Sequence, residues 1–311
     1  MRIGIVGAGA VGSFFGALLE KGGHQVTFLA RGKHLEMMQK KGLRIKKEND
    51  SFTVQSTFTD NPKQLENAEL ILFCVKSNDT EVMAKKLFPI LNSNAFIMTM
   101  QNGVNNEETL RKIFGVGRTF SCATYIQSSI IEPGVVKQQG RVALVIGELD
   151  NCASVQCSQI VTSFQRAGID TKHTSNILEK KWRKFLFNIT FNPLSAITTA
   201  SIGDILDDKD LRKTAESVCK EAMEVASKIG ISIDMNQTIE TIFNNGERAR
   251  GHRTSMLQDR LSGKQMEVES MCGYTMRKAE NLNISVPTIQ SFYSILTYLN
   301  KQQSLQNKII N

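Results

Sequence analysis

A glycine-rich turn at the N-terminus restricts the fold of this chain more than any other feature. An apolar strand is expected at residues 2–6 and a helix at 10–21. Between them runs the G-x-G-x-x-G pattern Gly7-Ala8-Gly9-Ala10-Val11-Gly12. In such a unit the first glycine allows a tight turn, the second lets a ligand approach the backbone, and the third lets the helix pack closely on the strand. The helix N-terminus then offers N–H groups and the positive end of its dipole to a phosphate.

The context of this turn favours dinucleotide binding over a ligand-free glycine turn. A second strand at 25–29 completes a βαβ unit, which implies a parallel, right-handed crossover. The further elements that we expect in the first half are strands at 70–75 and 95–100, helices at 80–87 and 107–114, a strand pair within 43–58 and a hairpin at 134–146. Alternation of this kind predicts an α/β fold with a Rossmann-like, doubly wound sheet domain over residues 1–175.

The second half of the chain has a different pattern. Strand-like runs end near residue 175, and helical periodicity follows. The expected helices are 177–191, 210–229, 236–248, 267–282 and 288–302. We therefore predict an all-helical C-terminal domain over residues 176–311.

The residue after the second strand indicates which dinucleotide binds. Enzymes that bind NAD place an acidic side chain about 20 residues past the glycines, where it binds the ribose hydroxyls. Arg31 stands in that region, and the first acid after it is Glu36. Because an arginine can pair with a 2′-phosphate, we predict NADP (NADPH) as the cofactor, with Arg31 as the phosphate contact. Lys33 either assists Arg31 or belongs to a solvated basic loop.

A polar stripe lies on one predicted helix of the second half. Lys184, Asn188 and Asn192 are spaced i, i+4, i+8, which puts them on one helical face among bulky apolar neighbours. Buried Lys and Asn side chains need polar partners, and burial lowers the pKa of a lysine toward a value suited to proton transfer. The other interpretation is a solvated polar face, with Asn192-Pro193 ending or kinking the helix. The pattern leaves both interpretations open.

Composition excludes several function classes. The 311 residues include 38 Lys and Arg against 30 Asp and Glu, and the net charge of +8 is spread along the chain rather than gathered in a stripe or tail. We therefore expect an anionic small-molecule ligand and no nucleic-acid partner. The uncharged run 3–19 is interrupted by glycines, so we interpret it as folded structure rather than a signal peptide or a membrane span, and we expect no membrane partner.

The cysteines and histidines form no metal-ligand pattern in the sequence. No CxxC pair occurs, and only Cys152 and Cys157 lie close together. The histidines, at positions 24, 34, 173 and 252, are not clustered with them. We expect no metal site. Free thiols suit a reducing cytoplasm, where we expect the protein to act.

The motifs of both halves together resemble those of the ketopantoate reductase (2-dehydropantoate 2-reductase) family, from residue 1 to about 290. Besides the glycine turn, the matching landmarks are Cys74-Val75-Lys76, Gln101-Asn102-Gly103, Trp182-Arg183-Lys184 through Asn188 to Asn192-Pro193-Leu194, and Ser255-Met256-Leu257-Gln258-Asp259 followed by Glu267. The resemblance implies NADPH-dependent reduction of a 2-oxo acid, 2-dehydropantoate, to pantoate for pantothenate biosynthesis.

The resemblance also implies a role for each matching residue. Lys184 is the implied general acid, and Glu267 is the carboxylate that hydrogen-bonds the substrate hydroxyl. The implied substrate anchors are Asn188, Asn192 and Ser255. The implied cofactor contacts are Lys76, Asn102 and the six residues of the glycine turn. Ser255 also stands where it can begin a short helix at 256–261.

One departure from the family bears on the substrate. Some relatives carry a substrate-binding Asn where this chain has Ile202, and Ser201 is a candidate to replace it. The alternatives are a related 2-oxo acid reductase, an opine-type dehydrogenase or a non-catalytic NADP-binding regulator. No histidine lies within the Lys184 helix for an opine-type proton relay, and a regulator would be expected to lose the proton donor. The sequence allows a homodimer.

Overall fold

The computed structural model describes residues 1–150 and 154–310, and it contains two compact units, Met1–Lys180 and Lys181–Asn311. Within the described residues, every strand belongs to the first unit, and the second is built from helices. The predicted sheet domain followed by a helical domain is therefore confirmed. The predicted boundary at 175/176 lies just before α6 (Ile177–Thr198), and the division between the two units falls in the first turn of this helix.

The strands of the first unit form one 10-stranded sheet. They are β1 (Arg2–Val6), β2 (Gln25–Leu29), β3 (Leu43–Lys46), β4 (Ser51–Val54), β5 (Thr57–Thr59), β6 (Leu70–Phe73), β7 (Phe96–Thr99), β8 (Thr119–Glu132), β9 (Val135–Glu148) and β10 (Thr171–His173). Their order is β4-β3-β9-β8-β7-β6-β1-β2-β5, with β10 beside β9. The run β5-β2-β1-β6-β7-β8 is parallel throughout, and it has the 3-2-1-4-5-6 order of a Rossmann sheet.

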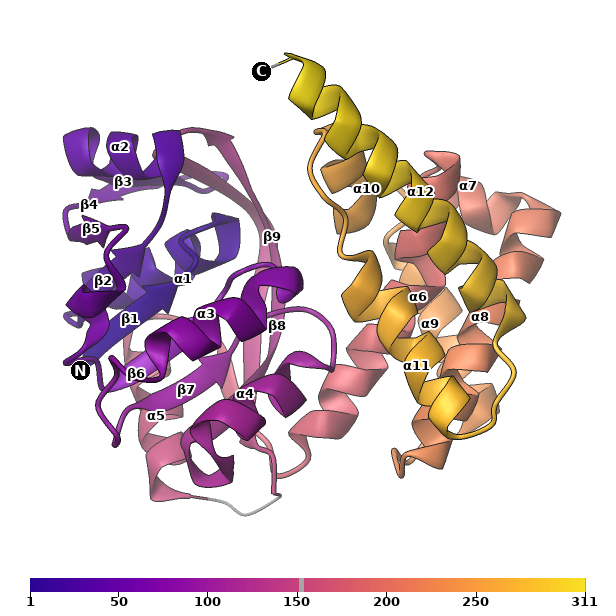
Figure 1. Cartoon of the computed structure of the whole chain (residues 1–311), viewed down its shortest axis with the longest axis horizontal. Helices are drawn as coiled ribbons and strands as arrows, with labels where there is room; N and C mark the ends of the chain where they lie inside the picture. The colour runs from indigo at the N-terminus through magenta and orange to yellow at the C-terminus, as the bar shows by residue number, and fades with distance from the viewer. Residues whose placement is uncertain (151–153, 311) are drawn as a thin grey trace. The chain divides into compact units, whose positions relative to one another are not determined.

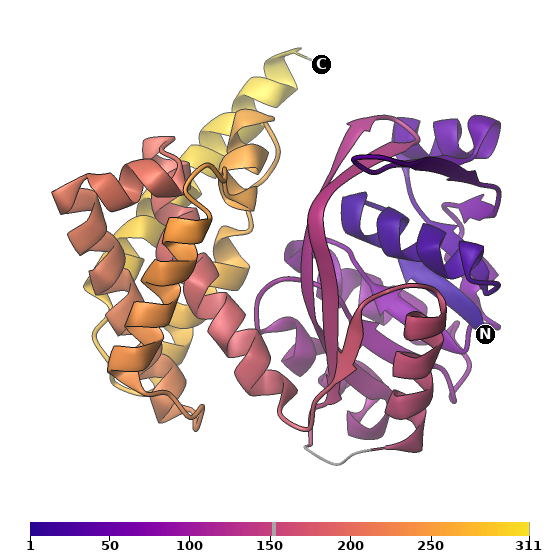
Figure 2. The same cartoon turned by 180° about the vertical axis from the view of Figure 1, so that it is seen from behind.

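Helices cover both faces of this sheet, as the doubly wound prediction requires. On one face lie α1 (Ala10–Lys21), α2 (Gly32–Lys41) and α5 (Val155–Arg166) (Figure 2). Their buried side chains belong to one hydrophobic core. On the other face, a second core contains side chains of α3 (Thr80–Leu87) and α4 (Asn106–Phe114) (Figure 1). Short 3-10 turns, at Pro62–Leu65, Ser77–Asp79 and Val116–Arg118, complete the connections.

Two parts of the sheet differ from the sequence prediction. The hairpin expected at 134–146 is wrong, because residues 135–146 belong to the single strand β9, which pairs antiparallel with the unpredicted strand β8. Gly134 forms the turn between them with φ of 80°, whereas Gly140 lies inside β9 where the pairing register shifts. The strand pair within 43–58 is confirmed as the antiparallel β3–β4 pair, but Thr57–Thr59 is a third strand, parallel to β2.

The second unit consists of α6 followed by further helical elements. They are α7 (Ile202–Asp207), α8 (Lys209–Lys228), α9 (Met235–Arg248), α10 (Ser255–Leu261), the π-helical turn η4 (Glu269–Gly273), α11 (Tyr274–Asn281) and α12 (Pro287–Ile310). Helix α6 continues through Pro193, so the predicted end near Phe191 is wrong. The helix expected to start at Glu267 starts instead with the wider π turn. No helix among the described residues is long and apolar enough to cross a membrane.

The described cysteines, which are Cys74, Cys122, Cys157, Cys219 and Cys272, are free thiols, as expected. Cys152 lies outside the described residues.

Close packing of α1 on the sheet depends on Gly16. A Cβ at this position would press on the buried Phe28 ring and lie 2.9 Å from the Ile5 side chain. We expect Gly16→Ala to lower the urea midpoint of unfolding, because overpacking costs about 1–3 kcal/mol and exceeds the gain of up to about 1 kcal/mol from the better helix former. Gly117→Ala is the matched control, since no atom lies within 4 Å of its added Cβ. Equal midpoints for the two variants would contradict this account.

Candidate active site

The glycine turn has the backbone geometry that the G-x-G-x-x-G pattern predicts. Gly7 has φ of +97°, and a Cβ there would lie 2.7 Å from the backbone nitrogen of Val75. A Cβ on Gly12 would overlap the Gly7 carbonyl oxygen. At Gly9, by contrast, no atom lies within 4 Å of the position that a Cβ would take. Gly7 and Gly12 are therefore required for packing within the protein, whereas Gly9 leaves open space beside the backbone.

The N-terminus of α1 suits a phosphate group. Gly9 is its N-cap residue, no side chain caps the helix, and the first turn contains no acidic residue. The N–H groups of Ala10, Val11 and Gly12 belong to the first turn, where an α-helix provides no internal acceptor. An anion at this point receives both the N–H groups and the helix dipole. The residues present therefore fit the pyrophosphate of a dinucleotide.

Lys76 and Asn102 lie at the same edge of the sheet as the glycine turn. The Cys74 N–H donates to the Val6 carbonyl at 2.8 Å, and the Met100 N–H donates to the Phe73 carbonyl at 2.9 Å. These bonds extend the pairing of β1, β6 and β7 just beyond their carboxyl ends. Lys76 is exposed and Asn102 is half-buried. In open α/β sheets, ligands bind at this edge, where the strand order reverses.

A buried hydrogen-bond network holds the two loops that carry Lys76 and Asn102. The Gln101 side-chain amide donates to the Val75 carbonyl at 2.9 Å and to the Thr80 hydroxyl at 2.7 Å. The Thr80 hydroxyl donates to Asn106 Oδ1 at 2.9 Å, and Asn106 Nδ2 donates to the Asn102 carbonyl at 2.8 Å. Buried amides that are satisfied in this way fix the backbone rigidly. Sequence reasoning assigned no role to Thr80 or Asn106, although polar residues after a buried strand were the available signal.

Arg31 lies at the same edge, beyond β2. It is the N-cap residue of α2, so the residues after it begin a helix and do not form the basic loop that was one of the two alternatives for Lys33. The Arg31 side chain is 90% exposed and pairs with the Asp79 carboxylate at 3.4 Å. An exposed pair of this kind is weak, so an incoming phosphate can displace the carboxylate at little cost. Lys33 lies in the first turn of α2 and is exposed.

The polar stripe of the helical unit lies on a continuous helix. Because α6 runs unbroken from Ile177 to Thr198, Lys184, Asn188 and Asn192 share one face over roughly 12 Å. Lys184 and Asn188 are half-buried and Asn192 is buried. The intervening residues anchor the helix in the apolar core, with the buried Phe191 ring 5.7 Å from the Phe243 ring of α9. A fully solvated polar face is therefore the wrong interpretation.

Helix α10, which carries Ser255, is fastened to the C-terminal end of α6. The Arg260 guanidinium donates to the Ala196 and Ile197 carbonyls, the latter at 3.0 Å. Arginine at a helix C-terminus satisfies carbonyls that have no partner within the helix. Thr254 caps α10, with its hydroxyl accepting from the Leu257 N–H at 3.3 Å. Ser255 is thus the first residue of the helix, with an exposed side chain, and does not cap it.

Glu267 is half-buried and lies two residues before the π turn. The neighbouring Met266 backbone exchanges two hydrogen bonds with the Asn300 side chain of α12, at 3.0 and 3.1 Å, which fixes the chain at this point. The next acid, Glu269, accepts hydrogen bonds from Arg277 and Tyr293, both at 2.5 Å. Burial opposes ionisation of Glu269, but these two hydrogen bonds outweigh it and hold the pKa of its carboxyl below its usual range. The Glu269 carboxylate is therefore engaged in structural hydrogen bonds.

The Ser201 hydroxyl is also engaged in structural hydrogen bonds, in this case in a helix cap. Its hydroxyl donates to the Asp204 carboxylate at 2.7 Å and accepts from the Asp204 N–H at 3.2 Å, which makes a capping box at the start of α7. Ile202 is fully buried. A hydroxyl engaged as both donor and acceptor is a poor replacement for the Asn that some relatives carry at this point.

Each unit thus gathers its own share of the predicted site residues. The sheet unit brings the glycine turn, Arg31, Lys76 and Asn102 to one edge of the sheet. The helical unit presents Lys184, Asn188 and Asn192 on α6, with Ser255 on α10 and Glu267 before the π turn.

Comparison with known proteins agrees with this division. Residues 3–151 match the family described as ketopantoate reductase PanE/ApbA, and residues 176–300 match its C-terminal part. A 2-dehydropantoate 2-reductase of Pyrococcus horikoshii is 32% identical over 287 residues, which cover 92% of this chain and 93% of that protein.

Solved structures share the fold over nearly the whole chain. The PanE/ApbA family ketopantoate reductase of Ralstonia eutropha JMP134 aligns with a TM-score of 0.92 at 28% identity, covering 98% of this chain and 100% of the other. A ternary structure of D-mandelate dehydrogenase with NADH and anilino(oxo)acetate aligns with a TM-score of 0.89 at 20% identity, covering 98% and 100%, which is a likeness of fold alone. On the strength of both family matches and the 32% identity, this chain belongs to the ketopantoate reductase PanE/ApbA family.

Proposed function

We propose that this protein reduces 2-dehydropantoate to pantoate with NADPH, the step that supplies pantoate for pantothenate biosynthesis. The observation that carries the proposal is the polar stripe on α6, because its lysine and two asparagines are partly or fully buried on a helix whose other faces carry buried aromatic rings. Family membership supplies the reaction class. The edge of the sheet supports dinucleotide binding through the uncapped N-terminus of α1 and the open space at Gly9.

The nicotinamide ring, when bound, supplies the hydride that reduces the 2-oxo carbon. In this proposal the protein's own residues bind the substrate and deliver the proton. Lys184 gives its ammonium proton to the carbonyl oxygen as negative charge develops there, and it stabilises that charge beforehand. Glu267 accepts a hydrogen bond from the substrate hydroxyl. Asn188, Asn192 and Ser255 bind the carboxylate and neighbouring polar groups.

A second candidate is the reduction of a different 2-oxo acid by the same residues. It is favoured by the buried Ile202 and by the engagement of Ser201 in the α7 capping box. Rates of NADPH oxidation with 2-dehydropantoate, with the 2-oxo acid that corresponds to mandelate and with unbranched 2-oxo acids distinguish the two candidates. We expect the highest kcat/KM with 2-dehydropantoate. A higher value for another acid would favour the second candidate, and no turnover with any of them would favour a non-catalytic protein.

Removal of Arg31 tests the choice of cofactor. We expect Arg31→Ala to weaken NADPH binding by about one to two decades, since a charge-assisted phosphate contact contributes roughly 1.5–3 kcal/mol, and to leave NADH binding nearly unchanged. Asp79→Asn should have the opposite effect on NADPH, because it removes the carboxylate that pairs with Arg31. Fluorescence titration with each cofactor measures both. Equal losses for NADPH and NADH in Arg31→Ala would show that Arg31 is not the phosphate contact.

Substitution of Lys184 tests the proton donor. Lys184→Ala should lower kcat by about two to four decades while NADPH affinity stays nearly unchanged. Lys184→Arg keeps the positive charge but cannot readily release a proton, so it should also be slow and thereby separate proton donation from charge stabilisation. Lys213→Ala, an exposed lysine on α8, serves as the control. Turnover of Lys184→Ala within a few fold of the wild type would make the stripe structural.

A further inference from the structure

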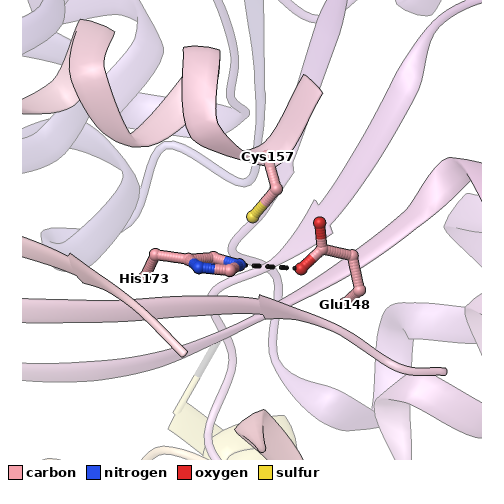
Figure 3. A group of neighbouring side chains, drawn as sticks. All are labelled: Glu148, Cys157 and His173. Carbon is pink, nitrogen blue, oxygen red and sulfur yellow. Dashed lines mark hydrogen bonds and ion pairs between the residues drawn. The ribbon is translucent and has the colours of Figure 1, made fainter. Parts of the chain in front are cut away.

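Three side chains with different ligand atoms converge in the sheet unit, apart from the glycine turn and Arg31. Glu148 ends β9, Cys157 lies in the first turns of α5, and His173 ends β10. Figure 3 shows the carboxylate, the thiol and the imidazole turned toward one another. One ligand atom of each lies within 4.8 Å of the ligand atoms of the other two. Sequence reasoning found no such group, because these residues belong to three different elements and fit no metal-ligand spacing.

The group is built into the protein and is not a chance meeting of flexible surface chains. Cys157 is fully buried, the Glu148 side chain is 7% exposed and the His173 side chain is 29% exposed. Glu148 Oε1 accepts hydrogen bonds from the Ser154 N–H and hydroxyl, both at 2.6 Å. Ser154 in turn caps α5 by accepting from the Cys157 N–H at 3.0 Å. The carboxylate and the thiol are therefore held in place by the start of the helix.

The negative charge of the buried Glu148 carboxylate also sets this group apart from an ordinary hydrogen-bonded contact. Burial opposes ionisation of Glu148, yet hydrogen bonds from Ser154 and His173 outweigh it and hold the pKa of the carboxyl below its usual range. Among the ion pairs of the described residues, the partner of this carboxylate is His173, at 2.9 Å, and no lysine or arginine pairs with it. A buried carboxylate is thus balanced by no fixed positive charge, and a bound cation would supply one.

We propose that Glu148, Cys157 and His173 form a binding site for a borderline divalent transition-metal ion such as Zn²⁺. Sulfur, nitrogen and oxygen ligands together suit Zn²⁺ and disfavour Mg²⁺ and Ca²⁺, which prefer oxygen alone. Zinc bonds of about 2.0–2.3 Å hold tetrahedral ligand atoms roughly 3.3–3.6 Å apart, so small side-chain shifts close the group around an ion. Three protein ligands leave the fourth position for water.

Binding of the metal ion displaces protons from the ligand side chains. The Cys157 thiol releases its proton to solvent as the sulfur–metal bond forms, and the partly exposed His173 carries its remaining proton on Nδ1 so that Nε2 binds the ion. The carboxylate and thiolate together neutralise the charge of a divalent cation. The ion would link β9, α5 and β10, so its expected effect is on the stability of the sheet unit and not on the reaction. The proposal is thus independent of the proposed function.

The test uses the full-length protein, freed of purification tags and stripped of metal with a chelator. We titrate it with Co²⁺, whose thiolate charge-transfer absorption reports a bond to cysteine, and then with Zn²⁺ by calorimetry. One ion per chain, a thiolate band that Zn²⁺ abolishes, and a rise in Tm with Zn²⁺ are expected. Absence of equimolar uptake would overturn the proposal and leave the group as a hydrogen-bonded contact only.

Substitutions of single residues identify which side chains bind the metal ion. His173→Gln should weaken Zn²⁺ binding by at least about 100-fold, since even the loss of a residue that only supports a ligand costs 10–100-fold. Cys157→Ser should abolish the thiolate band, and Cys219→Ser, a buried cysteine of the helical unit, should retain it. If Cys157→Ser fails to fold, His173→Gln decides alone, because its side chain is partly exposed. Unchanged Zn²⁺ affinity in His173→Gln would place the metal elsewhere and overturn the proposal.

Discussion

The close approach of β1, α1 and the loop after β6 is the constraint on which the sheet unit depends. Gly7 turns the chain with a positive φ directly against the backbone of Val75, and Gly12 packs on the carbonyl of Gly7. Side chains at these two positions would push α1 away from the strands. The same contacts bring the first turn of α1 to the carboxyl edge of the central strands. Packing and ligand binding therefore depend on the same few backbone atoms.

The helical unit depends on a different constraint, because it keeps polar side chains partly buried on a long apolar helix. Aromatic packing of α6 on Tyr274 of α11 and on Phe243 of α9 fixes the rotation of α6 about its axis, and that rotation decides where the Lys184 stripe points. Arg260 then ties α10 to the end of the same helix, while Asn300 holds the chain beside Glu267. The predicted substrate residues thus come from separate segments whose positions are set by hydrogen bonds to backbone atoms.

Local patterns in the sequence predicted those elements whose burial is regular. The glycine turn and the apolar runs of β1, β2, β6 and β7 were identified because all or most of their residues are buried. Strand β8 was missed because its first six residues are buried and the rest are mostly exposed, so it has neither a continuous apolar run nor a regular alternation. Helix α2 was missed because only Leu35 and Met38 of its residues are buried.

The candidate site residues also divide into those that a local pattern predicts and those that it does not. Spacing alone placed Lys184, Asn188 and Asn192 on one face, since the helical repeat is a local property. The roles of Glu267 and Ser255 came from the family resemblance, because no local pattern relates them to α6. Asn106 and the group around Glu148 depend on contacts between distant segments and could not be predicted without the fold. The commitment of Ser201 to a capping box was visible in the sequence as Ser followed three residues later by Asp.

The two irregularities in the β8–β9 pairing have a consequence for how the protein behaves in concentrated solution. Strand β8 pairs with β7 only over Thr119–Ser121, so the rest of that side of β8 is an open edge among the described strands. Tyr125, Ile130 and Ile131 are exposed along it, a combination that invites another chain to add a strand. The register shifts at Tyr125/Gln127 and Ile130/Glu132 break the even spacing of the N–H and C=O groups and increase the local twist. A long ribbon that exposes several apolar side chains is thereby made a poor template for intermolecular strand pairing.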